Sequence, residues 1–262
     1  MKKTERKTII SFDGTKIVYT IHFPKEKNKK IPVLFLHGAW GNKSVWARWL
    51  SFFEDHVWVA PDLRGHGESE RKNLSIENTI KDLDLILQKE KIDEIVILGN
   101  SYGALIAHHF YNKNKSKVKK LVLFSISANP FLRCVYLIRF ISTLGMALGR
   151  ILPSRKKVLI DYATLQHVSV SRIWWYDLKG LRFYDVMKIV NMIFTEQADL
   201  KTIYVPTLII EGKHDVFLKM KTIEKQAKNN KNIVFKKIEG IHRLMYKEKL
   251  EVIKKVRSFI EK

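Results

Sequence analysis

The fold of this chain is decided by one segment, IVILGNSYGALIA at residues 95–107. Its first four residues are apolar and predict a buried strand, and the residues after Gly103 predict a helix. Between the two lies a Gly-x-Ser-x-Gly pattern, whose glycines let the strand and the helix approach each other closely. Such a turn holds Ser101 in a strained conformation beside a helix N-terminus, which favours negative charge. The segment therefore predicts a nucleophilic serine at the end of a strand.

The composition is that of a soluble globular protein. Of the 262 residues, 46% are apolar and 28% are charged, and this length suits one sizeable α/β domain or two small ones. The charged segment 1–7 is not followed by an apolar stretch, so we expect no signal peptide. The single cysteine, Cys134, excludes an internal disulfide and fits a reducing compartment, and we therefore expect a cytoplasmic protein.

The formal charge of +22 is large. A charge of this size can attract an acidic partner, an anionic membrane surface or nucleic acid. Lysines are scattered along the whole chain, however, and solvated lysine faces are the simpler explanation. No nucleic-acid-binding motif accompanies the charge, so we expect no nucleic-acid partner.

Strand and helix patterns alternate along the first half of the chain. Two alternating runs, separated by Asp13-Gly14, predict a β-hairpin at 8–12 and 16–23. Short apolar runs then predict buried strands, and longer amphipathic stretches predict helices. The strands are expected at 33–36, 57–60, 95–98 and 121–124, and the helices at 42–54, at 75–89 and after Gly103. This order predicts an α/β fold with a doubly wound, mostly parallel sheet, which binds ligands at the carboxyl ends of its strands.

The pattern changes at Asn129-Pro130. Residues 130–199 contain several helix-like stretches and no buried-strand pattern, which we interpret as a helical cap inserted over the sheet edge. The core would then comprise residues 1–129 and 200–262, and an unrelated second domain is the alternative to the cap. The apolar stretch 131–152 contains three arginines, which argue against a membrane span.

The strand pattern resumes after the predicted cap. We expect strands at 205–210 and 233–238, a helix at 219–228 between them, and a closing amphipathic helix at 245–260. The sheet thereby gains two more strand ends at which side chains can meet the predicted nucleophile.

A serine hydroxyl is a poor nucleophile at neutral pH and needs a base, which in turn needs an orienting carboxylate. His242 lies on a loop after the last predicted strand and is the candidate base. Asp215 follows the preceding strand and is the candidate acid, with Glu211 at the end of that strand in reserve. The strand before that one supplies no nearby carboxylate. The chain order Ser101, Asp215, His242 is the one expected for this topology.

The oxyanion that develops during attack needs two preorganised N–H donors. Tyr102, the residue after the nucleophile, supplies one of them. The glycine-rich turn HGAWG at residues 37–41 follows a predicted strand and supplies the other. Ala39 is the favoured donor and Trp40 the alternative, while an ordinary strand-to-helix turn is the competing interpretation of this segment.

These motifs together resemble the α/β-hydrolase fold superfamily, in its branch of capped serine esterases and lipases. Residues His37–Gly41 are similar to the family's HGxxG oxyanion turn, and Pro61–Ser69 to its D-x-R-G-x-G-x-S loop. Gly99–Gly103 matches the nucleophile elbow, Gly212–Asp215 the acid motif and Gly240–His242 the histidine motif. The resemblance covers the chain except for the predicted cap.

The resemblance implies roles for five residues. Ser101 would be the nucleophile, Asp215 the acid and His242 the base. The main-chain N–H groups of Ala39 and Tyr102 would form the oxyanion hole. A serine at the nucleophile position, instead of an aspartate, argues against the dehalogenase and epoxide-hydrolase branches.

We therefore expect a serine hydrolase that cleaves the carboxylic ester of a small molecule, with a hydrophobic acyl group, through an acyl-enzyme. The alternatives are the same triad acting on a thioester or an acyl-carrier-protein ester, a C–C bond hydrolase or aminopeptidase, and a binding protein without activity. No cofactor is expected. No metal is expected either, because His37, His66 and Asp62 have no recognised ligand spacing.

The predicted cap is strongly basic near its start. Residues 131–160 contain no acidic residue and six basic ones, Arg133, Arg139, Arg150, Arg155, Lys156 and Lys157. Arg139 and Arg150 share a face if this stretch is helical. Cationic side chains beside apolar ones suit an anionic lipid surface or an acidic carrier protein. The alternative is that the apolar side chains pack within the cap and the arginines are merely solvated.

Overall fold

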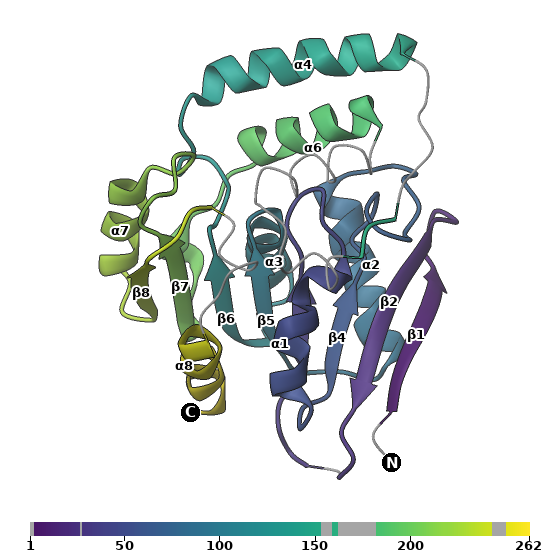
Figure 1. Ribbon diagram of the computed structural model, residues 1–262, viewed down its shortest axis with the longest axis vertical. Helices are drawn as coiled ribbons and strands as arrows, with labels where there is room; N and C mark the ends of the chain where they lie inside the picture. Colours follow the sequence, from purple (N-terminus) through teal and green to yellow (C-terminus); the bar gives the residue numbers. More distant parts are fainter. Residues whose placement is uncertain (1–2, 27, 153–158, 162–181, 243–249) are drawn as a thin grey trace.

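The computed structural model of the chain describes residues 3–26, 28–152, 159–161, 182–242 and 250–262. Within these residues, an eight-stranded sheet lies between helices, and two further helices lie beyond one end of the strands (Figure 1). The predicted α/β fold with a mostly parallel sheet is confirmed.

The strands lie in the order β1-β2-β4-β3-β5-β6-β7-β8. The pairs β1–β2 and β2–β4 are antiparallel, and every later pair of neighbours is parallel. The strand β1 begins earlier than predicted because its pairing with β2 continues to Lys3 opposite Phe23. The strands are β1 Lys3–Ile10, β2 Lys16–Phe23, β3 Val33–Leu36, β4 Trp58–Pro61, β5 Ile95–Asn100, β6 Val118–Phe124, β7 Thr207–Gly212 and β8 Ile233–Ile238.

Alternation along the buried strands produces two hydrophobic cores, one on each face of the sheet. In β3, Leu34 and Leu36 contribute to one core while Val33 and Phe35 contribute to the other. The first core is covered by α2, α3 and α7, and the second by α1 and α8. These helices are α1 Ala47–Leu50, α2 Ile76–Lys89, α3 Tyr102–Lys113, α7 Met220–Lys228 and α8 Leu250–Glu261.

The helix expected at 42–54 is broken into short pieces. The four-residue α1 lies between two 3₁₀ turns, Lys43–Trp46 and Ser51–Phe53. Aromatic and β-branched residues are weak helix formers. Here Trp46 and Trp49 pack edge-on against Phe124 in the second core. Tertiary packing of these rings therefore determines the local backbone. The predicted beginning of the last helix, before residue 250, lies outside the described residues.

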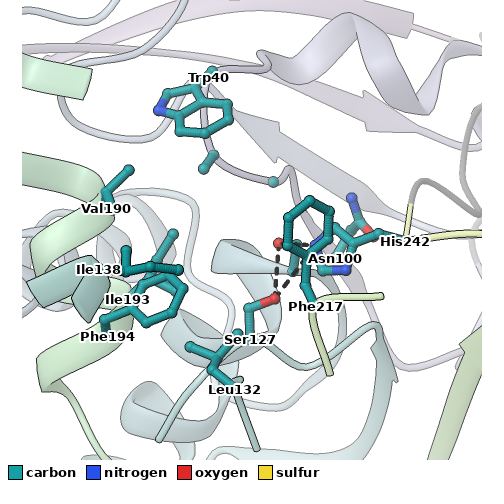
Figure 2. A pocket seen from close by; sticks show the side chains of 13 residues that line it. Trp40, Asn100, Ser127, Leu132, Ile138, Val190, Ile193, Phe194, Phe217 and His242 are labelled. Carbon is teal, nitrogen blue, oxygen red and sulfur yellow. Dashed lines mark hydrogen bonds between the residues drawn. The ribbon is translucent and has the colours of Figure 1, made fainter. Parts of the chain in front are cut away.

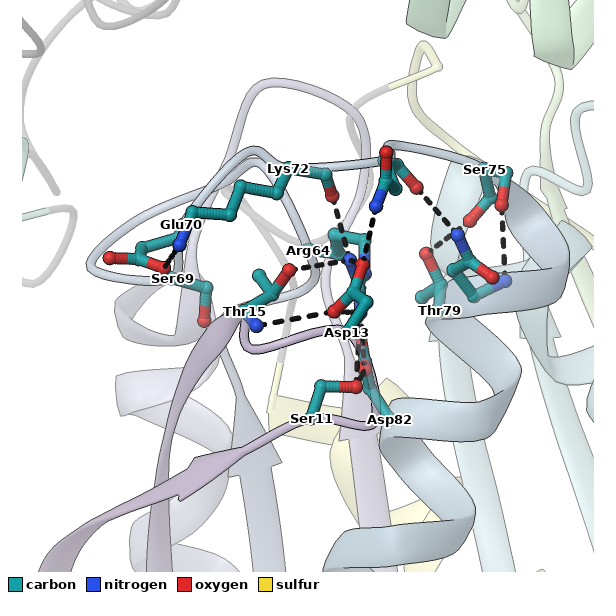
Figure 3. Close-up of polar contacts among 12 residues, drawn as sticks. Ser11, Asp13, Thr15, Arg64, Ser69, Glu70, Lys72, Ser75, Thr79 and Asp82 are labelled. Atoms are coloured by element: carbon teal, nitrogen blue, oxygen red, sulfur yellow. Dashed lines mark hydrogen bonds and ion pairs between the residues drawn. The ribbon is translucent and has the colours of Figure 1, made fainter.

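The buried side chain of Arg64, in the loop after β4, forms ion pairs with the β1–β2 turn and with α2 (Figure 3). The Arg64 side chain is fully buried, and its Nη2 lies 2.7 Å from Asp82 Oδ1 of α2. Its Nη1 lies 2.7 Å from Asp13 Oδ2 in the β1–β2 turn. A buried guanidinium is tolerated only when it is paired and hydrogen-bonded. Arg64 therefore joins three elements, which gives this part of the Pro61–Ser69 motif a structural role.

Helices α4, Val135–Ile151, and α6, Phe183–Thr195, lie beyond the carboxyl ends of the parallel strands (Figure 1). They are the described part of the predicted cap, and the cap boundaries 130 and 199 stay a prediction. The segments 153–158 and 162–181 of that region lie outside the described residues. Among the helices of the described chain, none is long and apolar enough to cross a membrane.

Candidate active site

Ser101 occupies the turn between β5 and α3 in a strained conformation, with φ +53° and ψ −110°. This turn brings strand and helix so close that a side chain could not be added to either flanking glycine. A Cβ on Gly99 would lie 2.5 Å from the Gly103 oxygen, and one on Gly103 would overlap the main-chain oxygen of Leu36. Ser101 is 9% exposed and lines a pocket. The elbow geometry expected from the sequence is present.

The side chains of Ser101, His242 and Asp215 form a continuous chain of hydrogen bonds. His242 Nε2 lies 3.0 Å from Ser101 Oγ, and His242 Nδ1 lies 2.6 Å from Asp215 Oδ2. Asp215 is fixed in turn, because its Oδ1 accepts a hydrogen bond from the Phe217 N–H at 2.8 Å. The three residues follow β5, β7 and β8, so the sheet brings together positions that are far apart in the sequence.

The histidine is also held by packing. The ring of Phe217 meets the ring of His242 edge-on, with 5.3 Å between centroids (Figure 2). Two other histidines that the sequence offers lie elsewhere. His214 is exposed and lies 3.1 Å from Glu239. His108 belongs to α3 and is buried against the Asp199 carbonyl, and this burial lowers its pKa to about 4.

Glu211, the reserve candidate for the acid, has a different environment. It is fully buried at the end of β7, and its Oε1 accepts a hydrogen bond from the Ile126 N–H at 3.1 Å. Burial raises the pKa of this carboxyl well above its ordinary value, and the charge of Asp215 raises it further. The carboxylate that forms the hydrogen bond with His242 is that of Asp215 and not that of Glu211.

The two expected oxyanion donors come from the turn after β3 and from the first residue of α3. Gly38, Ala39 and Trp40 line the pocket together with Ser101. Tyr102 is the first residue of α3, where a helix leaves its N–H groups without an internal acceptor. In the described part of the chain, the N–H groups of Ala39 and Tyr102 have no main-chain hydrogen bond. Both donors are thus available to a ligand.

Two polar residues of the pocket were missed by sequence reasoning. Ser127 Oγ lies 3.1 Å from Ser101 Oγ and 3.4 Å from His242 Nε2 (Figure 2). Asn100 is buried, lines the pocket, and has an Oδ1 with no partner among the described residues. The available signal was position, because Ser127 follows the end of β6 just as Ser101 follows β5. Serine is common in loops, so its position alone does not distinguish Ser127 in the sequence.

The remaining wall of the pocket is apolar and comes largely from α4 and α6 (Figure 2). The cavity encloses about 220 Å³. Its apolar lining consists of Trp40, Leu132, Ile138, Val190, Ile193, Phe194 and Phe217. The polar groups around Ser101 and this apolar wall face the same space, so one ligand could contact both.

The described residues contain one group with a metal-like arrangement, Asp55, His56 and Glu261. Lys30 and Arg257 form ion pairs with both carboxylates of this group, so its negative charge is already compensated. His37 and Asp62, at the strand ends near the pocket, also have hydrogen-bond or ion-pair partners. His37 Nε2 accepts from the Leu63 N–H at 3.0 Å, and Asp62 Oδ2 pairs with Lys43 at 2.6 Å.

Comparisons with known proteins agree with this architecture. A family model described as the alpha/beta hydrolase fold matches residues 31–143. An epoxide hydrolase 2 from Siraitia grosvenorii is 31% identical over 126 residues, which are 45% of this chain and 38% of that protein. The first curated relatives are matched over a little more than a third of their own length.

Solved structures match almost the whole chain. A hydrolase from Pseudomonas aeruginosa has a TM-score of 0.79 at 16% identity, covering 98% of this chain and 99% of its own. An esterase from Exiguobacterium antarcticum has a TM-score of 0.75 at 20% identity, covering 98% of this chain and 100% of its own. At such identities, these similarities establish the fold and leave the chemistry to the residues of the site.

Proposed function

Because this chain belongs to the α/β-hydrolase fold superfamily, we propose that it is a serine hydrolase that cleaves carboxylic esters of small molecules through an acyl-enzyme. The observation that carries the proposal is the hydrogen-bonded chain from Ser101 through His242 to Asp215, with 3.0 Å and 2.6 Å between its polar atoms. A nucleophile, a base and an orienting carboxylate in this order are the minimal set for nucleophilic acyl transfer.

In the first half of the reaction, Ser101 Oγ attacks the ester carbonyl carbon while His242 Nε2 accepts the hydroxyl proton. Asp215 accepts a hydrogen bond from His242 Nδ1–H, which fixes the tautomer and stabilises the imidazolium. The tetrahedral oxyanion binds the N–H groups of Ala39 and Tyr102. When the intermediate collapses, the C–O bond breaks and the imidazolium gives its proton to the leaving alkoxide.

In the second half, water attacks the acyl-enzyme. His242 takes a proton from the water and later returns it to Ser101 Oγ as the carboxylic acid leaves. The apolar wall from α4 and α6 supports a hydrophobic acyl group as the part of the substrate held in the pocket. Apolar lining of this kind contributes binding by burial and has no hydrogen-bonding preference.

Ester cleavage is favoured over epoxide opening, although one matched relative bears the name of an epoxide hydrolase. The residue at the elbow is a serine, and its attack on an acyl carbon is what two oxyanion donors stabilise. The same groups would serve a thioester, a C–C bond next to a carbonyl or a peptide amide. A substrate panel that contains all four classes separates these reactions.

The decisive experiment combines labelling with a variant. A fluorophosphonate probe should modify Ser101 in the wild-type protein, as located by mass spectrometry of the adduct. Ser101→Ala should stay folded and lose at least about 10⁴-fold in kcat on p-nitrophenyl esters, since the nucleophile and base act as a unit. Labelling of a different serine, or turnover retained by Ser101→Ala, would overturn the proposal.

A further inference from the structure

Helix α4 turns its large apolar side chains away from the protein. Eight residues on it and at its end are between 47% and 87% exposed: Tyr136, Leu137, Phe140, Ile141, Leu144, Leu148, Ile151 and Leu152. At 3.6 residues per turn they fall on one side of the helix, which is about 25 Å long. Contiguous exposed apolar surface of this kind marks an interaction site on a soluble protein. We call this surface the outer face of α4.

The opposite side of α4 is lined by small residues that fit tightly against α6. A Cβ on Gly145 would lie 2.6 Å from Met187 Sδ, and one on Gly149 would lie 2.9 Å from the Tyr184 Cα. Asn191 Nδ2 of α6 also donates to Ser142 Oγ at 3.1 Å. At these two glycines, the helices approach too closely for a side chain to be added to α4. The helix therefore could not rotate to bury its outer face without losing this contact.

Helix α6 is itself anchored to the core. The buried Asp185 of α6 lies 3.3 Å from Arg71 Nη1 in the loop after β4 and 2.9 Å from Arg182 Nε. A buried carboxylate that lost these partners would be strongly destabilising. The contacts of α6 with the core and with α4 therefore hold α4 in this orientation.

The two charged residues of α4 are both positive. Arg139 and Arg150 are exposed, and their spacing of about three helical turns places them along the same flank of the apolar surface. Neither has an ion pair with a described residue. Helix α4 contains no acidic residue, and the whole chain carries a formal charge of +22. An arginine can lay its alkyl part on an apolar surface and keep its charge at a phosphate.

We propose that the outer face of α4 docks onto an anionic phospholipid bilayer, with the helix lying in the plane of the headgroups. An apolar face flanked by cations is the pattern of an interfacial helix, which binds by burying apolar area and attracting anionic lipids. A cationic rim complements an anionic surface and would repel a second copy of the same helix. Insertion as a spanning helix is excluded for α4 by its length and its arginines.

The docking places the pocket next to the lipid. Ile138, on the inner side of α4, lines the pocket while its neighbours Leu137 and Ile141 are on the outer face. One helix therefore separates the bilayer from the ester-binding site. This consequence, that substrates reach the site from the membrane, rests on the proposed hydrolase function. The docking itself does not, because it requires no group of the catalytic chain.

The test measures sedimentation of the full-length protein with vesicles, so that it is independent of hydrolysis. At low ionic strength, the wild type should bind phosphatidylcholine vesicles that contain phosphatidylglycerol, and bind pure phosphatidylcholine at least tenfold more weakly. Arg139→Glu with Arg150→Glu should weaken binding to the anionic vesicles at least tenfold, on the scale of about 1 kcal/mol per basic residue at such a surface. Phe140→Gln with Leu144→Gln should do the same without any change of charge.

The matched control is Lys254→Glu with Lys255→Glu on α8, which lies at the opposite end of the molecule (Figure 1). This pair makes the same change in net charge at exposed positions, and it should leave vesicle binding within twofold. An equal loss in the control would mean that net charge alone attracts the vesicles, and it would overturn the proposal. So would a wild type that fails to bind, or outer-face variants that bind fully. Circular dichroism and thermal melting verify that each variant is folded.

Two other binding partners of the outer face, a second copy of the chain and an acidic acyl-carrier protein, would give different experimental results. A wild type that elutes as a dimer, and becomes a monomer with Phe140→Gln and Leu144→Gln, would assign the face to a second copy and overturn the proposal. Salt-sensitive binding of an acidic acyl-carrier protein, with no vesicle binding, would also overturn it. Loss of esterase activity has no bearing on these outcomes.

Discussion

Helices α3 and α4 are both rich in apolar residues and both adjoin the pocket, yet they place their side chains in opposite ways. Nine of the twelve residues of α3 are buried, but only three of the seventeen in α4. Both use glycines at their tightest contact, Gly103 against β3 and Gly145 against α6. The comparison teaches that small residues select the contact face of a helix. Burial of the larger side chains then depends on what lies around the rest of it.

The inner side of the pocket, formed by the strand ends and the start of α3, should be far more sensitive to substitution than the outer side. After loss of the nucleophile itself, the largest effect should come from Asp215→Asn, which preserves the shape but favours the wrong tautomer of His242. We expect kcat to fall by about 10³–10⁴-fold. Steady-state kinetics on a soluble p-nitrophenyl ester provide the measurement.

The control for this prediction is on the same strand. Glu211→Gln removes a carboxyl that hydrogen-bonds Ile126 and does not contact His242, so its kcat should stay within about tenfold of the wild type. If kcat is unchanged in Asp215→Asn and falls strongly in Glu211→Gln, the wrong carboxylate has been assigned.

The next effect compares one leucine from each helix. Leu105 on α3 is fully buried and Leu144 on α4 is more than half exposed. Leu105→Ala should lower the free energy of unfolding by about 2–5 kcal/mol, because it removes buried methyl groups and leaves a cavity. Leu144→Ala should change it by less than about 0.5 kcal/mol, as expected of a surface substitution. Urea unfolding of both variants measures the difference, and equal losses would mean that the outer face is covered within the protein.

The smallest effect concerns the buried carboxyl of Glu211. Its pKa is raised in the folded state, so it stays protonated at a pH where the unfolded chain, with an ordinary value of 4.5, has lost the proton. Wild-type stability should therefore fall as the pH rises above that value. Glutamine does not titrate. From pH 4 to pH 8, the free energy of unfolding of Glu211→Gln should therefore rise by on the order of 1 kcal/mol relative to that of the wild type. Thermal unfolding of both proteins at both pH values tests the sign. A stability advantage of the variant that grows toward acid pH would contradict the prediction.

The fold, and the meeting of Ser101, Asp215 and His242 at one place, could be predicted because each is tied to a short local pattern at a strand end. Ser101, Asp215 and His242 are chemically distinctive and follow apolar runs that are clear in the sequence. Ser127 was missed because serine is common in loops, and only the position of β6 beside β5 brings it to Ser101. Asn100 directly precedes Ser101 at the end of β5, and only the folded structure shows that it lines the pocket.

The orientation of α4 was harder to predict for a different reason. The apolar stretch 131–152 has enough large side chains to bury, so packing within the cap was one of two open interpretations. The distinguishing signal was Gly145 and Gly149, four residues apart on the side that meets α6. Glycine spacing indicates a close helix contact, but the identity of the partner helix depends on tertiary structure.

The order of the strands also has a consequence for how the protein is made. Ser101 follows β5, whereas His242 and Asp215 follow β8 and β7, and β6 must pair with β7 across the whole of α4 and α6. Contacts between residues so distant in the chain form late, because the intervening loop has to close first. On the ribosome, the nucleophile emerges long before residue 242 does. For the proposed hydrolase, turnover of a soluble ester therefore requires these final strand pairings, so activity would measure the fraction of the protein that has folded completely.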